Sequence, residues 1–291
     1  MSKIKSLLYT LLVMLLWGSL FPTVKLGYTL YNVVTVGDII FFAGVRFTIC
    51  GAVICLYTLI TDRKSFVLSP STMMAVLASG LFAIILHYSF TYSALTLTDS
   101  SKTAILKQVG ILFYIGLSSL FFKDDKLTFK KLIGAIMGFV GIIAININTN
   151  GISFNIGDIL IILASFCTVF SNIISKKVFS KVKPITSTGI SQLFGGICLL
   201  VIGMLLGGDI KFSYDSTIFI FIYICLASII SYTIWFSVVK KEDLSNLFII
   251  KFSEPVFACV FGALILGENI FKIQYLAAFL LICGGIYISN K

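Results

Sequence analysis

Charged residues are scarce in this sequence. Asp, Glu, Lys and Arg together make up 12% of its 291 residues, there is one histidine, and 58% of the residues are hydrophobic. An ordinary soluble domain is about a quarter charged. The composition therefore excludes a soluble enzyme.

The sequence also lacks the motifs that hold cofactors. It has no phosphate-binding loop of the GxxxxGK[ST] type and no HExxH zinc motif. Its seven cysteines form no CxxC pair and all lie inside apolar runs, where we interpret them as small packing residues. We therefore expect no metal, no cofactor and no ATP-driven activity within this chain. The cysteines are Cys50, Cys55, Cys167, Cys198, Cys225, Cys259 and Cys283.

Apolar runs of membrane-spanning length recur along the whole chain. A hydrocarbon core about 30 Å thick is crossed by about 20 helical residues, so ten spans would leave only short loops. The first run follows Lys3 and Lys5 and continues past Pro22 without a small-residue cleavage site, so we interpret it as a helix and not as a signal peptide. The sequence predicts an all-α integral membrane protein with ten transmembrane helices, at residues 6–26, 37–60, 71–95, 101–122, 128–147, 155–178, 186–206, 215–239, 244–266 and 271–289.

The basic residues predict the orientation of these helices. The net charge is +10, but Lys and Arg lie in short patches between apolar runs, which argues against nucleic-acid binding. Four lie in loops on one side of the membrane, namely Lys25, Lys102, Lys211 and Lys272. Fifteen lie on the other side, which the positive-inside rule places in the cytoplasm together with both termini: Lys3, Lys5, Arg63, Lys64, Lys123, Lys126, Lys130, Lys131, Lys176, Lys177, Lys181, Lys183, Lys240, Lys241 and Lys291.

An internal repeat relates the two halves of the chain. An offset of 144 residues aligns Lys107 with Lys251, Phe113 with Phe257, Asp124 with Glu268, Leu132 with Leu276 and Gly141 with Gly285. A repeat of five helices places its second copy in the membrane in the opposite sense. Many secondary transporters surround a midplane site with such inverted repeats. We expect repeats at residues 1–150 and 151–291.

Several short motifs follow one another along the chain. They are residues 17–21 (WGSLF) with Lys25, then Phe47 after Arg46, residues 254–257 (EPVF), residues 266–268 (LGE) and the glycine pair at 284–285. In this order and spacing they resemble one family, the EamA-like, ten-helix branch of the drug/metabolite transporter superfamily. The first half departs from the pattern, because it has no proline near Ile111 and no glutamate near Asp124. The resemblance implies a transporter and leaves the cargo open, since the family carries solutes from amino acids to drugs.

Three basic residues lie inside predicted spans: Arg46, Lys107 and Lys251. An ionised group near the bilayer centre costs about 2.5–3.5 kcal/mol, so it usually faces a cavity or a partner. We expect Lys107 and Lys251 to flank one interior site for a carboxylate or phosphate, with Gln108 beside them. Alternatively each lysine reaches the headgroups, or Lys251 pairs with Glu254 three residues later. For Arg46 we favour a structural role, paired with backbone carbonyls or Asp38.

Glu254 is the acid that lies well inside a span. Burial can raise the pKa of a carboxyl group until it changes its charge near neutral pH. Glu254 is therefore a candidate for proton coupling as well as a counter-ion for Lys251. Pro255 frees the carbonyl of Lys251, and Pro22 frees that of Gly18, because proline has no N–H. We interpret both prolines as candidate hinges.

The remaining candidates are His87, Tyr88 and Trp17. His87 could relay protons or bind cargo, although a lone helical histidine is more often a satisfied interior residue. Tyr88 shares a helix stripe with Tyr92. Trp17 could stack on an apolar part of the cargo or simply pack.

These observations favour a secondary transporter over a membrane enzyme or a structural membrane protein. The excess of buried positive charge predicts amino acids or related carboxylated solutes as cargo, carried by alternating access, with export as the common direction in the family. The alternative is an exporter of drugs or quaternary ammonium cations that depends on Glu254. We expect the lipid bilayer and a small solute as partners, a bacterial plasma membrane as location, and no nucleic acid. The oligomeric state is open.

Overall fold

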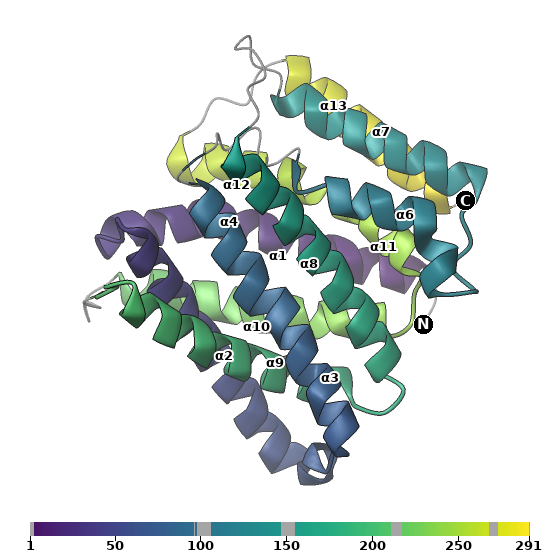
Figure 1. Cartoon of the computed structure of the whole chain (residues 1–291). Coiled ribbons are helices and arrows are strands. Elements are labelled where there is room, and N and C mark those ends of the chain that lie inside the picture. The colour runs from purple at the N-terminus through teal and green to yellow at the C-terminus, as the bar shows by residue number, and fades with distance from the viewer. Residues whose placement is uncertain are drawn as a thin grey trace.

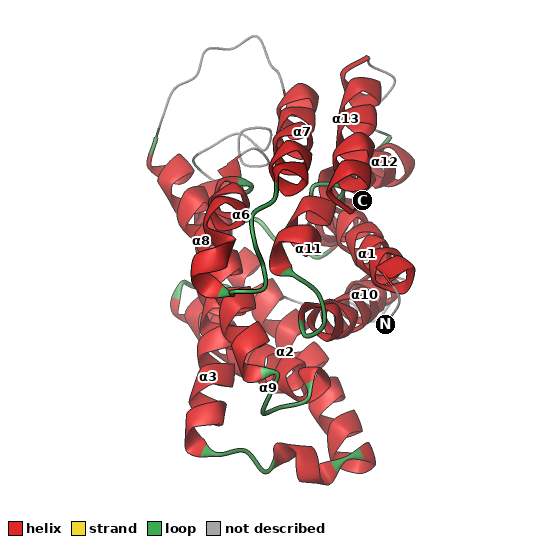
Figure 2. Cartoon of the chain, turned by 90° about the vertical axis from the view of Figure 1, so that its right-hand side faces the viewer, coloured by secondary structure: helices red, strands yellow, loops and turns green. Residues whose placement is uncertain are grey.

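The computed structural model describes residues 3–95, 97, 106–146, 155–210, 217–267 and 273–290. Within these ranges the chain forms helices joined by loops and turns, with no β-strand (Figure 2). Glu268, Lys102, Lys211, Lys272 and Lys291, which entered the repeat or the charge count, lie outside the described residues.

The helices follow the predicted apolar runs. The first half contains α1 (Lys3–Leu30), α2 (Val36–Thr61), the short η1 (Arg63–Phe66), α3 (Pro70–Gly80), η2 (Leu81–Leu86), α4 (His87–Leu95), α6 (Val109–Phe121) and α7 (Phe129–Asn146). The second half contains α8 (Ile156–Val178), α9 (Pro184–Leu205), α10 (Ile218–Val239), α11 (Leu244–Lys251), α12 (Glu254–Leu266) and α13 (Ile273–Asn290). Among the described residues, seven helical segments are long and apolar enough to cross a membrane, and two shorter apolar helices accompany them. The chain is therefore an all-helical, multi-pass membrane protein.

Three predicted spans depart locally from a regular α-helix, and the sequence analysis expected such a departure in only one of them, at the candidate hinge Pro255. The third contains the π-helical turn η2 between α3 and α4. In the fourth, Lys107 and Gln108 form a turn before α6. The ninth breaks at Phe252 and Ser253, between α11 and α12. The last break has a direct cause, because Pro255 cannot donate a backbone hydrogen bond.

Capping residues fix where the long helices begin. Thr35 and Asp38 form a capping box on α2, and Asn155 and Asp158 form one on α8. At the other end of a helix, Gly267 ends α12 with a φ of 69°, a left-handed conformation that glycine adopts without a Cβ penalty. Local sequence therefore sets these boundaries.

Glycines bring α2 and α9 into close antiparallel contact. A Cβ added at Gly44 would lie 2.4 Å from the backbone nitrogen of Leu200, and one at Gly196 would lie 2.3 Å from that of Thr48. Small residues at such positions are typical of helix pairs in membranes. The pair α7 and α13 meets in the same way and lies side by side in Figure 1, with a Cβ at Gly285 placed 2.7 Å from the carbonyl oxygen of Gly134.

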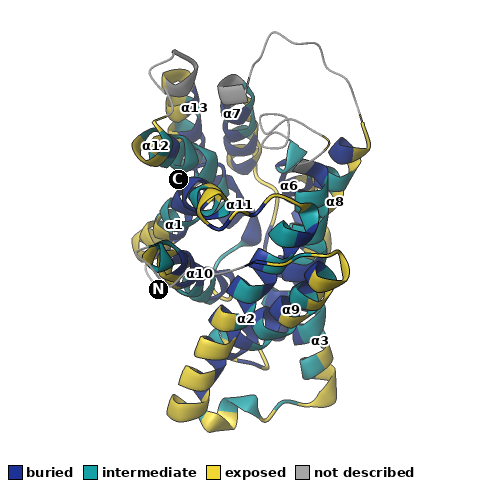
Figure 3. Cartoon of the chain, turned by 90° about the vertical axis from the view of Figure 1, so that its left-hand side faces the viewer, coloured by how far each residue is buried: buried dark blue, intermediate teal, exposed yellow. Residues whose placement is uncertain are grey.

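The other helices interlock between the two halves. Helix α1 packs against α10 and α12 of the second half, and α8 packs against α3, α4 and α6 of the first half. Both chain ends lie at the same end of the bundle (Figure 1). Figure 3 shows buried positions along α2, α9 and α11 and exposed ones at the projecting end of α2. Large apolar side chains on outer faces, such as Ile60, Leu120 and Leu205, are exposed, as a bilayer requires.

Candidate functional site

Lys251 lies at the break between α11 and α12, and its ammonium group is held on two sides. It forms an ion pair with Glu254, one turn on, whose side chain is 13% exposed compared with 15% for Lys251. On another side the ammonium lies 4.3 Å from the ring centroid of Trp17 in α1. A carboxylate and an aromatic face together compensate a buried cation. In this structure Lys251 is therefore paired.

Lys107 lies at the matching break before α6. Its ammonium group is 5.4 Å from the ring centroid of Phe21, and it interacts electrostatically with both Glu254 and Lys251. None of the described carboxylates forms an ion pair with Lys107. The structure thus brings the two lysines close to each other, and among the described carboxylates Glu254 is the one that lies near both ammonium groups.

Aromatic side chains from α1 and α10 continue this region. The Trp17 ring packs 5.2 Å from that of Trp235 and 5.5 Å from that of Tyr232. Trp235 donates a 2.7 Å hydrogen bond from Nε1 to Asn172 in α8. This bond fixes the indole ring of Trp235. The ring of Trp17 contacts Lys251 on one side and Tyr232 on another.

Two neighbouring residues of α4 point to different partners. The hydroxyl oxygens of Tyr88 and Tyr232 lie 3.2 Å apart and join α4 to α10. Nδ1 of His87 lies 3.0 Å from the carbonyl oxygen of Ala164 and 3.1 Å from Oγ1 of Thr168, both in α8. A carbonyl only accepts, so Nδ1 carries the proton in this contact. His87 thus has the environment of a satisfied interior histidine.

Arg46 is 4% exposed and differs from the sequence interpretation. Its Nε donates a 2.9 Å hydrogen bond to Ser228 of α10. The predicted pairing with Asp38 is wrong, because that carboxylate accepts from the backbone nitrogens of Thr35 and Asp209 at the start of α2. Because Asp38 caps α2, its carboxylate does not pair with Arg46.

The other sequence candidates occupy the same breaks or a continuous helix. Gln108 is buried in the turn beside Lys107. Pro255 lies in the first turn of α12, directly after the break. Pro22 lies inside α1, which continues on both sides of it. The hinge and binding roles of these residues stay predictions.

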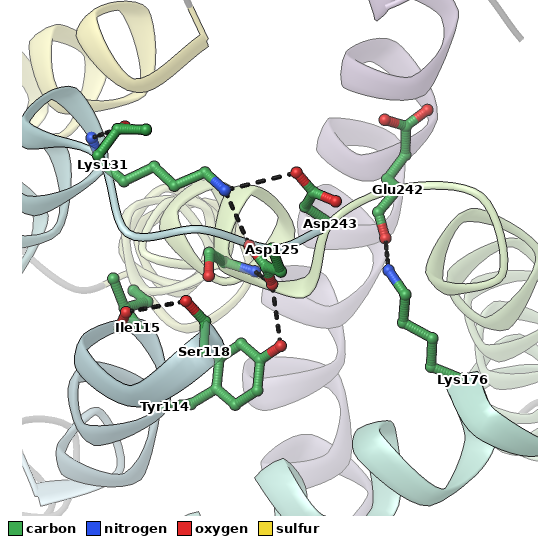
Figure 4. A network of polar contacts seen from close by, with 10 residues as sticks. Tyr114, Ile115, Ser118, Asp125, Lys131, Lys176, Glu242 and Asp243 are labelled. Atoms are coloured by element: carbon green, nitrogen blue, oxygen red, sulfur yellow. Dashed lines mark hydrogen bonds and ion pairs between the residues drawn. The ribbon is translucent and has the colours of Figure 1, made fainter. Parts of the chain in front are cut away.

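The sequence analysis missed a polar network that joins the loop before α7 to the start of α11 (Figure 4). It lies at the end of the bundle that holds both chain ends (Figure 1). Asp125, 1% exposed in the loop between α6 and α7, accepts hydrogen bonds of 2.9 Å from Tyr114, 2.8 Å from Lys131 and 3.0 Å from the backbone nitrogen of Ser245. Asp243, the N-cap residue of α11, lies 3.4 Å from Lys131. The first half thereby caps a helix of the second half.

The turn between α10 and α11 adds further contacts at the same end of the bundle. The carboxylate of Glu242 accepts from Ser6 of α1, and its backbone oxygen accepts from Lys176 of α8. Burial alone would raise the pKa of Asp125, but the hydrogen bonds from Lys131 and Ser245 outweigh burial, so its pKa lies below the usual value for an aspartate. No short motif signals this network, because Ser245 lies 120 residues from Asp125 in the sequence.

Comparison with known proteins identifies the family. The model of the EamA-like transporter family matches residues 4–147 and again residues 155–290. The chain belongs to the EamA-like transporter family. It is a transporter, and the relatives described below are named as transporters or efflux pumps and not as enzymes.

Two relatives of this EamA-like protein are distant in sequence but match nearly the full length of the chain. An uncharacterized transporter of Archaeoglobus fulgidus is 23% identical, with 94% of each chain covered. A protein of Escherichia coli strain K12 named "Probable amino-acid metabolite efflux pump" is 25% identical, covering 96% of this chain and 92% of its own. A crystal structure with 18% identity superposes with a TM-score of 0.81 and covers 99% of this chain and 97% of its own. That structural likeness shows the fold.

Proposed function

We propose that this protein exports amino acids or related carboxylated solutes, and that its cargo binds between Lys107, Lys251 and Trp17. The observation that carries the proposal is the charge of the interior. Lys251 is already paired with Glu254, so Lys107 supplies a positive charge that the described carboxylates do not pair with. A cargo carboxylate would supply the missing counter-charge. The name of the Escherichia coli relative agrees with this class of cargo.

The transport mechanism we propose is alternating access by two inverted repeats of five helices, residues 1–150 and 151–291. The two separate matches to the family model support this division. So do the glycines, because Gly141 contacts Ala278 and Ile282 just as Gly285 contacts Gly134 and Gly138. An offset of 144 residues relates Gly141 to Gly285, Gly134 to Ala278 and Gly138 to Ile282, and the two helices run in opposite directions, as an inverted repeat requires.

Within this mechanism, the network around Asp125 would close one side of the interior site. It joins the loop of the first half to the start of α11, the helix that ends at Lys251. The excess of Lys and Arg in the loops at this end supports a cytoplasmic position. We place the protein in the bacterial plasma membrane, with both termini in the cytoplasm and the Asp125 network as the inner gate.

Ligand-dependent thermal stability of the purified protein in detergent tests the class of cargo. A ligand that binds only the folded state stabilises it by about 2.7 kcal/mol at a concentration of 100 times Kd. We expect stabilisation by amino acids or carboxylates, lost in Lys107→Gln and retained in Lys64→Gln, a matched change at an exposed lysine. Transport of the stabilising compound into proteoliposomes is the second step.

The opposite result would replace the proposal by export of organic cations. That outcome is stabilisation only by compounds such as tetraphenylphosphonium, abolished by Glu254→Gln and unaffected by Lys107→Gln. It is disfavoured because the face of Trp17 already holds the ammonium group of Lys251, so an organic cation would have to displace that charge. Proton coupling through Glu254 would appear as a pH gradient driving uptake in the same proteoliposomes.

A further inference from the structure

Arg46 is a second buried cation, and its surroundings resemble a receptor for an anion. The side chain lies ten residues beyond the start of α2 and is almost fully buried. Its guanidinium carbon lies 4.8 Å from the ring centroid of Phe47. Tyr88, Tyr92 and Tyr232 are all within electrostatic reach of it. Phenol groups donate hydrogen bonds to anions, and α4 and α10 bring three of them into the neighbourhood of this cation.

The protein uses only a small part of the hydrogen-bonding capacity of the Arg46 guanidinium. Arginine carries five N–H donors in a planar fork, and the hydrogen bond that the structure gives it is from Nε to the neutral hydroxyl of Ser228. Within the described ranges, no aspartate or glutamate forms an ion pair with Arg46. Burying a cation without a counter-charge costs several kcal/mol. The terminal nitrogens are suited to a carboxylate held in two-point contact.

Tyr232 connects Arg46 with the lysine region. It lies in the neighbourhood of both Arg46 and Glu254, and its ring packs 5.5 Å from Trp17 and 6.0 Å from Phe47. Trp17 in turn lies under Lys251. Trp17 and Tyr232 therefore form an aromatic wall that connects the surroundings of Arg46 with those of Lys251. Arg46, Lys107 and Lys251 against Glu254 leave an excess of two positive charges.

We propose that Arg46 is a cargo-binding residue and that the cargo carries two anionic groups, one held by Arg46 and the other by Lys107. This inference rests on the proposed function and narrows it from carboxylated solutes to dicarboxylates. A dicarboxylate neutralises both unpaired cations at once. The aromatic wall of Trp17 and Tyr232 lines the stem between its two ends.

Titration with succinate and its monoamide succinamate tests the proposal. The two compounds have the same length, and because succinate is symmetric, its orientation does not affect the result. The purified full-length protein in detergent should bind succinate about 10- to 100-fold more tightly than succinamate, which is the contribution of one hydrogen bond to a charged group. In Arg46→Gln we expect this ratio to fall to about two, the statistical advantage of two identical ends, while succinamate binding through Lys107 changes little.

The controls separate a binding role from a structural one. Arg63→Gln makes the same change at the other arginine of the chain, which is exposed, and should keep the ratio. Arg46→Lys keeps the positive charge but loses the planar, two-point contact of the guanidinium, so we expect an intermediate ratio of succinate to succinamate affinity. It also decides the question if Arg46→Gln does not fold. A merely structural Arg46 would lower stability without changing the ratio.

Three results would overturn the inference. The first is a succinate to succinamate ratio near two in the unmodified protein, with both compounds bound; the proposed function then stands while the dicarboxylate class fails. The second is an unchanged ratio in folded Arg46→Gln or Arg46→Lys. The third is binding of neither compound together with binding of tetraphenylphosphonium, which overturns the proposed function as well.

Discussion

Replacing Asp125 by asparagine is expected to destabilise the protein by about 3 kcal/mol. The carboxylate accepts three hydrogen bonds, two from the neutral donors Tyr114 and Ser245 and one from the cation Lys131. Asparagine retains an oxygen for the neutral donors, but its amide group cannot accept from the ammonium. Breaking a buried pair costs about 3–5 kcal/mol, and the lower end applies because Lys131 keeps Asp243 at 3.4 Å.

Thermal unfolding in detergent measures this effect. A loss of 3 kcal/mol corresponds to a fall in Tm of roughly 6–12 °C if 1 kcal/mol shifts Tm by about 2–4 °C, as in chains of 150–250 residues. Asp124→Asn is the matched control, because Asp124 is the exposed neighbour in the same loop. A Tm for Asp125→Asn equal to that of Asp124→Asn would refute the reasoning.

Asp125→Asn should also change how the stability of the protein depends on pH. The pKa of Asp125 is lowered in the folded protein, so the unfolded chain binds its proton first as the pH falls. The stabilisation is therefore complete above the unfolded pKa of about 3.9 and is lost as the pH falls through the folded value. Asp125→Asn should lack this loss, and its acid stability curve should approach that of the unmodified protein.

Two further variants test packing and the interior ion pair. Gly51→Ala should destabilise the protein, because the new Cβ would lie 2.2 Å from the backbone nitrogen of Leu193, whereas Gly116→Ala meets nothing within 4 Å and should be neutral or slightly stabilising by Tm. Glu254→Gln should destabilise more than the double variant with Lys251→Gln, because the single change leaves a buried cation unpaired; equal losses in a double-mutant cycle would contradict the pairing.

The sequence predicted the helices far better than it predicted the polar contacts. Runs of apolar residues set the spans because lipid requires uniform apolarity over about 20 residues. The pairing of Lys251 with Glu254 followed from a local spacing of three residues. For Arg46 we expected backbone carbonyls or Asp38 as partners, but its Nε donates to the hydroxyl of Ser228, and Asp38 satisfies a helix start. Asp125 had no distinguishing signal, because its partner Ser245 comes from the other half of the chain.

The positions at which the two proposed repeats differ support an asymmetric cargo site. In α2 and α9 an offset of 152 residues relates Gly44 to Gly196 and Gly51 to Gly203, so the contact between these helices is duplicated. The same offset relates Arg46 to Cys198, and the offset of 144 relates Glu254 to Gly110. The packing is therefore repeated while two of the charges are not.

This asymmetry gives the interior two distinct ends. Lys107 and Lys251 occupy equivalent breaks, but Glu254 neutralises one of them, and Arg46 adds a cation on a single side. In the proposed mechanism, the repeated packing would let both halves rock about the same contacts, whereas the unequal charges would bind the cargo in one orientation. On this reasoning, exchanging the two residues in the double variant Arg46→Cys and Cys198→Arg would retain the fold contacts of α2 and α9 and lower the succinate to succinamate ratio to about two, because the guanidinium would no longer lie beside Ser228 of α10.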